Sequence, residues 1–427
     1  MPKLKVLNLF GLQQSSLPSS IDLLRNLQTL CLDYSKVKDF TIIGRLKTLK
    51  VLSLQNSVIE EFPIEMSQLT QLRLLDLSNC WKLEGMPTNV ISQLSQLEDF
   101  FLKGCPIKWK YEELAELKLL SKLTSLELDI KDNNVLPRDF FSKELKRYKI
   151  SVGDWFFRYP IKSNLVENLR ILKFQSNSTV SLEEICGIKK VEVLCIAKSS
   201  NDAKDLDETL MRPLFNEKIN SNLKVFEWID GREKRRICWQ SQSKTLTICN
   251  TNIPIGLLKR FYNLKKLELF EIQNKEIKGL FDLRDLEVLH VLSCHRLMSL
   301  LSFSASFQNL KVLNICSYHG LVMKLITPSM AKSLVQLREM SIHYIETFTE
   351  IVEYEGDATT MDIVFDNLNK LSLTNLENLI CFCSGNYSFS FPSLERLIIE
   401  RCPNMKIFSP GSLSTPKLHN VYYEKKL

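Results

Sequence analysis

The stretch LKVLSLQNSVIEEFPIEMSQLTQLRLLDL, residues 49–77, decides the fold because it holds two copies of the pattern L-x-x-L-x-L, one beginning at Leu49 and the next at Leu72. On both sides of this stretch, the pattern returns along the whole chain once other apolar residues are allowed in the leucine slots. Its starts are about 24 residues apart on average, within the range of about 20 to 29 that one class of stacked repeats uses. The eighteen starts fall at residues 4, 27, 49, 72, 97, 123, 145, 169, 191, 223, 243, 264, 286, 310, 337, 368, 394 and 418.

The spacing inside each copy predicts a short strand. The two inner leucines lie two residues apart, so both point to one face of the strand and the residues between them point to the other. Because one short strand cannot hold a core, neighbouring repeats must stack into a parallel sheet that buries a column of leucines. The sequence therefore predicts an α/β leucine-rich-repeat solenoid of about 18 repeats, curved, with the parallel sheet on its concave face. The inner leucines expected to be buried are Leu7, Leu30, Leu52, Leu75, Leu126, Leu267, Leu313, Leu371 and Leu397.

The repeats differ in regularity along the chain. Residues 1–130 and 263–427 follow the template well, whereas residues 131–262 place aromatic or polar side chains in several leucine slots. Leucine is abundant throughout, with 71 of 427 residues, and hydrophobic residues make up 44%, so there is ample apolar surface for a core. We interpret residues 1–427 as one solenoid with an irregular middle.

Cysteine or asparagine occupies the eighth position after several starts, where its side chain can satisfy backbone groups in the turn that leaves the strand. The twelve cysteines are scattered along a chain that is not small, which favours reduced thiols over a disulfide framework. Strands in neighbouring repeats lie about 4.8 Å apart, so distance alone leaves a disulfide between the neighbouring turns open. The eighth-position residues are Cys80, Cys105, Cys294, Cys402 and Asn177.

Motifs for catalysis, cofactors and metals are missing from the sequence. No glycine is followed by lysine, so the phosphate-binding loop G-x-x-x-x-G-K-[ST] cannot form within it. The histidines form no H-E-x-x-H motif and the cysteines form no C-x-x-C pair. No apolar run reaches the roughly 18 residues that span a bilayer, and a net charge of +7 falls short of a nucleic-acid footprint. We therefore expect a binding protein and not an enzyme, with no cofactor, metal, nucleic acid or membrane span.

Binding is expected on the concave face, where side chains are exposed yet held on a rigid sheet. Aromatic residues there are candidate anchors, because aromatic side chains are enriched among interface hot spots. A separate basic patch could meet a phosphate or an acidic partner, or could be a solvated turn. The candidates are Phe101, Glu127, Asp129, Lys149, Lys173, Phe270, His290, His343 and Tyr422 on the concave face, and Arg232, Lys234, Arg235 and Arg236 in the basic patch.

Two sets of segments carry a family resemblance. The linkers LPSSIDLLRNLQTL at 17–30 and FPIEMSQLTQLRLL at 62–75 resemble those of cytoplasmic plant leucine-rich repeats. The stretches EIVEYEGDATTMDIVFDNLNKLSL at 350–373 and FCSGNYSFSFPSLERLIIERCPNMKIFSPGSLSTPKL at 382–418 look like the last repeats of plant nucleotide-binding leucine-rich-repeat disease-resistance proteins of the coiled-coil type.

The resemblance implies a cytoplasmic protein-recognition module of an immune receptor. In such receptors a nucleotide-binding domain precedes the repeats, and we expect it to lie outside this chain. Early repeats are then expected to restrain that domain, while later repeats bind a pathogen effector or a guarded host protein. A stand-alone scaffold or ubiquitin-ligase substrate adaptor is the alternative, although an adaptor would need an F-box-like helical segment that the sequence does not contain.

Overall fold

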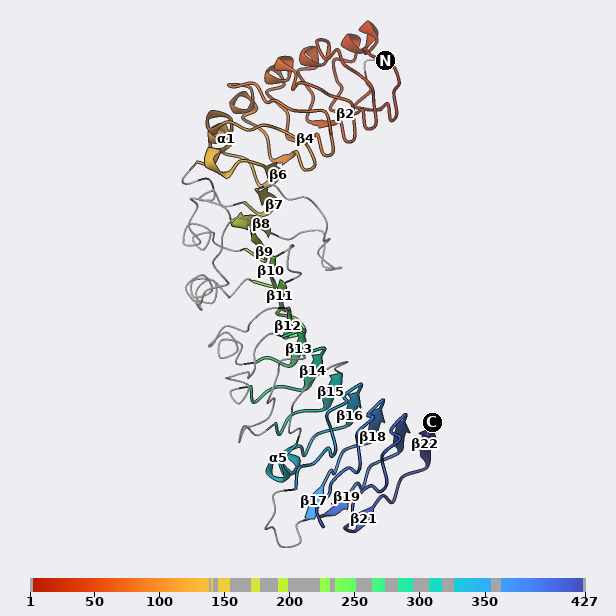
Figure 1. Ribbon diagram of the computed structural model, residues 1–427. Helices are drawn as coiled ribbons and strands as arrows, with labels where there is room; N and C mark the ends of the chain where they lie inside the picture. The colour runs from red at the N-terminus through yellow and green to blue at the C-terminus, as the bar shows by residue number, and fades with distance from the viewer. Residues whose placement is uncertain are drawn as a thin grey trace. The chain divides into compact units, whose positions relative to one another are not determined.

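The computed structural model describes residues 3–137, 140, 145–153, 170–176, 191–198, 223–230, 235–250, 263–272, 283–294, 307–316, 326–354 and 362–424. A strand begins within two residues of each of the eighteen predicted starts. The chain divides into two compact units, one holding the described strands up to β9 and the other holding those from β10 onward. Within each unit the strands stand side by side (Figure 1). The leucine-rich-repeat solenoid predicted from the spacing is confirmed.

The first unit is a parallel stack in chain order. Each strand pairs with the strand of the next repeat, and the inner leucines face each other in register, as Leu30 does with Leu52 and Leu52 with Leu75. All of its described pairings are parallel. Its strands are β1 (Val6–Asn8), β2 (Thr29–Cys31), β3 (Val51–Ser53), β4 (Leu74–Asp76), β5 (Asp99–Phe101), β6 (Ser125–Ile130), β7 (Arg147–Val152), β8 (Arg170–Ser176) and β9 (Val193–Lys198).

The second unit departs from the prediction at its first strands. An additional strand, β11, which no repeat start predicts, pairs antiparallel with both of its neighbours. From β12 onward the strands of the main sheet are parallel again. The strands are β10 (Val225–Asp230), β11 (Arg235–Gln240), β12 (Thr245–Cys249), β13 (Lys266–Phe270), β14 (Val288–Leu292), β15 (Val312–Cys316), β16 (Glu339–His343), β18 (Lys370–Thr374), β20 (Arg396–Glu400) and β22 (Asn420–Glu424).

Short helices fill the linkers between strands. In the first unit, Pro18 and Pro63 directly precede 3-10 helices, because proline fixes φ near the value at which a helical turn begins. One apolar side chain from each of these helices, Ile21 or Met66, is buried. Figure 1 shows these helices along the side of the unit opposite to its strands. They are η1 (Ser19–Leu23), η2 (Ile43–Arg45), η3 (Ile64–Gln68), η4 (Ile91–Gln93), α1 (Tyr111–Glu116), η5 (Leu117–Leu119) and η6 (Asn133–Val135).

In the described part of the second unit, the linkers of the last repeats contain strands as well as a helix. A helix, α5 (Pro328–Ser333), is followed by a second parallel sheet of β17 (Asp362–Val364), β19 (Ser388–Ser390) and β21 (Leu413–Ser414). Stacked phenylalanine rings lie beside that sheet, as the 4.5 Å between the ring centroids of Phe382 and Phe408 shows. The phenylalanines of the segment that resembles resistance-protein repeats therefore form part of the core.

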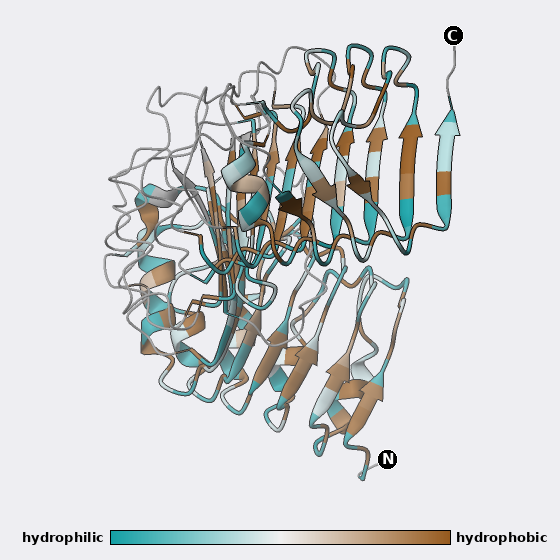
Figure 2. Cartoon of the chain, turned by 90° about the horizontal axis from the view of Figure 1, so that it is seen from below, coloured by the Kyte–Doolittle hydropathy of each residue, from teal (hydrophilic) through white to brown (hydrophobic). Residues whose placement is uncertain are grey.

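The leucine column is buried as predicted, except at two positions. Leu30, Leu52, Leu75, Leu126, Leu267, Leu313 and Leu371 are at most 2% exposed. Leu7 and Leu397 are instead half-buried, so the prediction is wrong for them. Leu7 lies on β1, which has a described neighbour on one side only, and the strand beside Leu397 is β22, where Val421 is itself exposed. Figure 2 shows the brown, hydrophobic strands that carry this column.

The seventh residue after most starts adopts the left-handed conformation. The φ angle is +71° at Gly11, +61° at Asn79 and +80° at Gly104. Asparagine and glycine tolerate this conformation better than other residues, which explains their frequency in that slot. The chain therefore turns off the strand at the same place in successive repeats. Other seventh residues with positive φ are Tyr34, Asn56, Asn250, Glu271, Ser293, Tyr344, Asn375 and Arg401.

The eighth residue binds the preceding repeat. The Cys80 thiol donates to the carbonyl of Leu54 at 3.1 Å, and the Cys105 thiol donates to the carbonyl of Leu77 at 3.0 Å. Ser57 occupies the same slot without having been predicted, and its hydroxyl donates to the carbonyl of Leu32 at 2.8 Å. We call these bonds the eighth-position ladder. Cys294 and Cys402 make the equivalent contacts to Leu269 and Leu373, while Asn177 lies outside the described residues.

Thiol counting on the denatured chain, without reductant, is expected to find twelve free thiols. Eleven cysteines are described and all are free, although Cys80 and Cys105 are neighbours. Their contact and burial raise the pKa of the Cys105 thiol, which keeps it protonated at neutral pH. Reaction of the unfolded protein with a chromogenic disulfide reagent measures the number. A count of ten would mean that one pair is bridged and would contradict the prediction that the thiols are reduced.

Candidate functional site

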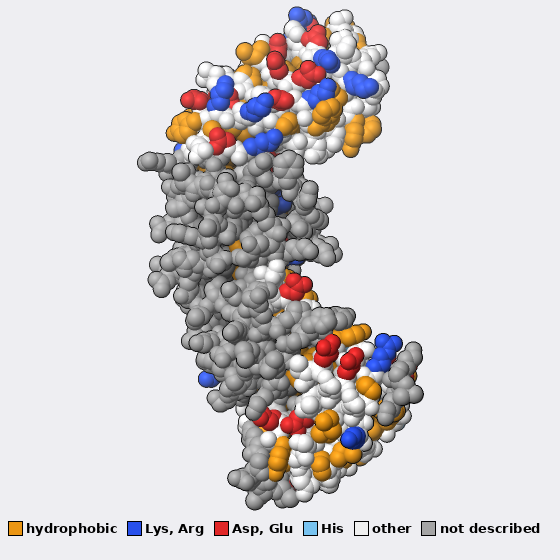
Figure 3. All heavy atoms as spheres, viewed as in Figure 1, with side chains coloured by type: hydrophobic (Ala, Val, Ile, Leu, Met, Phe, Trp, Pro, Cys, Tyr) orange, Lys and Arg blue, Asp and Glu red, His pale blue; other side chains and the backbone are white. Residues whose placement is uncertain are grey.

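On each strand that carries the leucine column, alternate side chains point away from that column. We define the first strand wall as these side chains on β5 to β8. The second strand wall is the equivalent set on β12, β13, β14, β15, β16, β18, β20 and β22. Figure 3 shows acidic and basic side chains interspersed over the described surface of the first unit. The first wall contains Asp99, Phe101, Ser125, Glu127, Asp129, Arg147, Lys149, Ser151 and Lys173.

The first wall brings three of the predicted residues into one row. Phe101, Glu127 and Lys149 are neighbours on β5, β6 and β7. The Lys149 ammonium lies 2.8 Å from a Glu127 carboxylate oxygen, and both side chains are partly exposed. Phe101 is half-buried and not fully exposed. An ion pair of this exposure contributes about 0 to 1 kcal/mol, so a partner can replace it at little cost.

A second row of the first wall contains Asp129 and Lys173. Asp129 accepts a hydrogen bond from the backbone N–H of Gly104 at 2.8 Å, which fixes its carboxylate at the turn. Repeat alignment would put Lys173 beside Lys149, but the register between β7 and β8 shifts by two residues and puts Lys173 in the row of Ser151 and Asp129. Lys173 is 9% exposed, so little of it is available to a partner. Burial and the nearby Lys173 charge lower the pKa of Lys103.

The second wall carries an apolar run on four neighbouring strands. Cys249, Phe270, Leu292 and Cys316 are neighbours in register on β12 to β15, and each is half-buried. His343 continues the row, and its Nδ1 lies 2.5 Å from the Thr374 hydroxyl. Burial lowers the pKa of the His343 imidazole, which makes it neutral at pH 7. The run is therefore an apolar strip that ends on an uncharged imidazole.

Beside this strip, Glu268 connects several polar groups. It accepts a hydrogen bond from the Thr247 hydroxyl at 2.9 Å and pairs with Lys266 at 2.8 Å. Burial raises the pKa of Glu268, but the bonds from Lys266 and Thr247 outweigh it and lower the value overall. His290 Nδ1 lies 3.6 Å from the same carboxylate, and burial lowers its pKa. Tyr422 lies apart on β22, is 51% exposed and donates to Glu424 at 3.1 Å.

The predicted basic patch is only partly described. Arg236 lies on β11, where its guanidinium pairs at 2.5 Å with Glu227, a residue only 4% exposed. The extra antiparallel strand makes this possible because it places Arg236 beside β10. Arg232, Lys234 and the side chain of Arg235 lie outside the described residues. The described part is thus an ion pair between β10 and β11.

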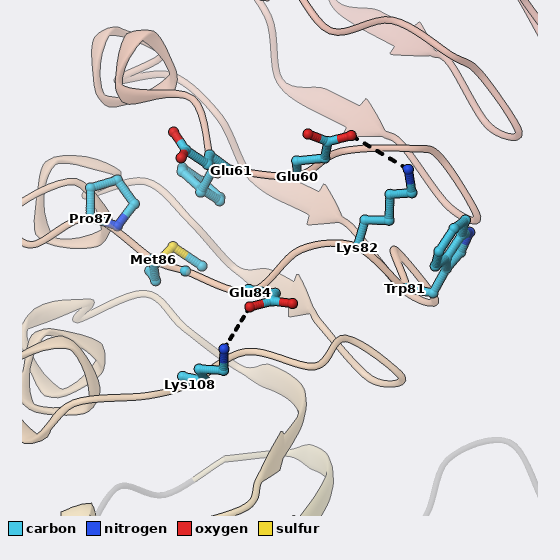
Figure 4. Close-up of a pocket in the computed structure, with 10 residues that line it drawn as sticks. Glu60, Glu61, Trp81, Lys82, Glu84, Met86, Pro87 and Lys108 are labelled. Carbon is cyan, nitrogen blue, oxygen red and sulfur yellow. Dashed lines mark hydrogen bonds and ion pairs between the residues drawn. The ribbon is translucent and has the colours of Figure 1, made fainter.

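A groove that the sequence did not predict lies on the side of the first unit. It lies where the chain leaves β3, β4 and β5, and its cavity volume is about 830 Å³. Figure 4 shows Trp81 at one end, with Lys82 between Trp81 and Glu60. The position of Trp81 directly after the eighth-position Cys80 was the signal that could have revealed it, since an aromatic residue just past a buried slot is left at the surface. The lining residues are Glu60, Glu61, Phe62, Trp81, Lys82, Glu84, Gly85, Met86, Pro87 and Lys108.

The described part of the chain shows neither a metal site nor a membrane-spanning helix. Among the described residues, no group of three or more His, Cys, Asp or Glu side chains is arranged to hold a metal ion. The described helices are all too short or too polar to cross a bilayer. The described surface does offer side-chain arrangements suited to binding another protein.

Comparison with known proteins points to plant immunity. A family model described as "Plant disease resistance protein RPS2-like, leucine-rich repeats" matches residues 303–419. Two Arabidopsis thaliana proteins match over most of the chain: Disease resistance protein At4g27190, 25% identical over 94% of this chain, and Putative disease resistance protein At4g19050, 25% identical over 86%. The matches cover 38% and 29% of those two proteins. Together they support a leucine-rich-repeat region of a plant resistance protein.

A solved structure supports the fold alone. The crystal structure of the TLR13–ssRNA13 complex superposes with a TM-score of 0.51, covering 94% of this chain and 62% of TLR13, at 16% identity. Likeness at this identity carries no information about what is bound.

Proposed function

We propose that this chain, a leucine-rich-repeat region of the plant disease-resistance type, is the sensor part of an intracellular immune receptor and that its two walls contact different partners. The homology with resistance proteins supports a recognition module in plant defence. Under the proposal, the first wall contacts the receptor's own nucleotide-binding domain and the second wall binds a pathogen effector or a guarded host protein. The module acts by binding and carries out no reaction of its own.

The difference between the walls is the observation that carries the proposal. The first wall is charged, and its Glu127–Lys149 pair is exposed enough to be exchanged for contacts with another domain. Such contacts suit a restraint that must be released. The second wall presents the apolar strip around Phe270, and a half-buried aromatic side chain on a rigid sheet is a typical interface anchor. Such an anchor suits a ligand that must be held.

The test uses a full-length receptor that contains this region, expressed in leaf tissue with and without the matching ligand. Glu127→Lys is expected to cause cell death without ligand, because two lysines then face each other and the restraining surface becomes more positive by two charges. Phe270→Ala is expected to weaken the ligand-dependent response about 10- to 30-fold, as loss of an anchor does, and to leave the resting state silent. The reverse pattern would mean that the roles of the walls are exchanged.

A charge swap provides the control for folding. The double variant Glu127→Lys with Lys149→Glu restores the internal ion pair in the opposite direction. If the swap is still active without ligand, the wall contacts another surface whose charges no longer match. If the swap silences the receptor again, the single variant acted only by breaking the internal pair, and the proposed restraint by this wall is wrong.

A further inference from the structure

We propose that the side groove of the first unit, lined by Glu60, Trp81 and Lys82, binds an arginine side chain from an extended segment of a partner protein. The inference rests on the proposed function, since it assumes a module that binds proteins. It adds a second contact surface, away from the strand walls, and names the chemistry of the side chain that this surface receives.

Three successive repeats build the groove from their extended segments. The backbone N–H of Glu84 donates to the carbonyl of Glu60 at 3.4 Å, and that of Lys108 donates to the carbonyl of Glu84 at 2.9 Å. A parallel bridge between Glu61 and Gly85 joins the first two segments. These bonds hold the groove open as part of the repeat stack, so a ligand would find it formed.

The groove has an apolar floor and a charged rim. Phe62 and Met86 are each 3% exposed and form its buried side. Trp81, by contrast, is 61% exposed, so its ring is accessible to a ligand. A volume of about 830 Å³ lies within the range that binds ligands of drug-like size or a short peptide segment.

An internal lysine already shows which chemistry the rim accepts. The Lys82 ammonium lies 5.0 Å from the centroid of the Trp81 ring and 3.5 Å from a Glu60 carboxylate oxygen. A cation is thus held between an aromatic face and a carboxylate (Figure 4). Lys82 is held loosely, because Glu60 also pairs with Lys38 at 3.6 Å and the Lys82 side chain is 38% exposed. We regard Lys82 as a replaceable occupant.

Arginine is better suited to this position than lysine. Its planar guanidinium stacks on an aromatic face while its N–H groups bind a carboxylate as a fork, which a single ammonium cannot do. Glu61 is exposed, but its carboxylate points away from Trp81, so Glu60 is the carboxylate beside the ring (Figure 4). Glu84 is less available because Lys108 pairs with it at 2.6 Å. The favoured ligand is therefore an arginine placed over Trp81, with its fork directed to Glu60.

The experiment titrates the full chain with three blocked peptides that differ only in the central residue, Gly-Arg-Gly, Gly-Lys-Gly and Gly-citrulline-Gly. The indole N–H signal of Trp81 in NMR spectra, assigned by its loss in Trp81→Phe, reports binding. We expect a saturable shift with the arginine peptide, an affinity for the lysine peptide at least about threefold lower, and no saturation with citrulline, which has arginine's shape without its charge. Equal responses to arginine and citrulline would overturn the proposal.

Two substitutions are expected to change the affinity in opposite directions, and a third serves as a control. Lys82→Ala is expected to raise the affinity for the arginine peptide about threefold, because the internal competitor is gone. Glu60→Gln is expected to lower the affinity about threefold, because it removes the negative charge that the guanidinium binds. Lys47→Ala changes a lysine that binds Gln68 outside the groove and should leave the affinity unchanged. The indole signals of the other tryptophans check the fold of each variant.

A weaker binding to Lys82→Ala would show that Lys82 supports the groove and does not compete for it, which would overturn the proposal. Failure of the proposed function has a different signature. If the peptide titrations give the expected order while Glu127→Lys and Phe270→Ala leave the receptor unchanged, only the roles of the walls are wrong. If the walls behave as proposed and the arginine peptide does not bind, only the groove is wrong.

Discussion

Leu75→Ala is expected to lower the free energy of unfolding by about 2 to 5 kcal/mol. Leu75 is fully buried, and its register neighbours are Leu52 on β3 and Phe100 on β5. Truncation removes apolar contacts on both sides and leaves a cavity that two rigid neighbouring strands cannot close. Urea denaturation followed by far-ultraviolet circular dichroism measures the loss of stability.

A matched leucine controls for the change of composition. Leu23 lies on η1 and is 71% exposed, so Leu23→Ala should change the free energy of unfolding by less than about 0.5 kcal/mol. Equal effects at the two positions would contradict the burial on which the solenoid is built.

Gly104→Ala is expected to cost about 1.5 to 3.5 kcal/mol, for two additive reasons. Gly104 has a φ of +80°, where an L side chain costs about 1 to 2 kcal/mol. A Cβ at this position would also collide with the side-chain oxygen of Asn79 in the preceding turn, and displacing that side chain from its rotamer costs about 0.5 to 1.5 kcal/mol. The same denaturation experiment measures the sum.

Two other glycines separate the contributions. Gly11 has a φ of +71°, and no atom lies within 4 Å of the place that an alanine methyl group would occupy, so Gly11→Ala should cost only the backbone part, about 1 to 2 kcal/mol. Gly85 has neither a positive φ nor a neighbour within 4 Å, so Gly85→Ala should be neutral or stabilising by up to about 1 kcal/mol. An order other than Gly104, Gly11, Gly85 would contradict this account of the turns.

The repeat pattern predicted one strand at each of its eighteen starts because the leucine slots report burial directly. It could not predict β11, since Arg235–Gln240 has no leucine slot and its placement depends on pairing with both neighbours. The two-residue register shift between β7 and β8 could not be predicted from the sequence either. Because of this shift, Lys173 does not lie beside Lys149. Both features result from contacts between strands, which a repeat-by-repeat alignment does not contain.

The candidate surfaces were predictable only in part. Alternation along the strands placed Glu127 and Lys149 on the same wall, but the ion pair between them depends on side-chain rotamers. The apolar strip became visible only when Cys249, Leu292 and Cys316 were found beside Phe270. The groove at Trp81 lies on extended segments that the leucine pattern does not constrain. Sequence periodicity thus locates the scaffold more reliably than the surfaces between its repeats.

The eighth-position ladder has a consequence for how genes of this kind can change. Each described bond of the ladder reaches only the repeat immediately before it, as Cys80 reaches Leu54 and Cys105 reaches Leu77. Duplicating or deleting one whole unit by unequal recombination would therefore present the same donor to the same carbonyl at the new junction. An insertion of one or two codons inside a unit would instead misplace both the donor and the left-handed corner before it. Such a gene can therefore gain or lose whole repeats without disturbing the ladder. Point mutations in the codons of wall residues can meanwhile change which partners the protein binds.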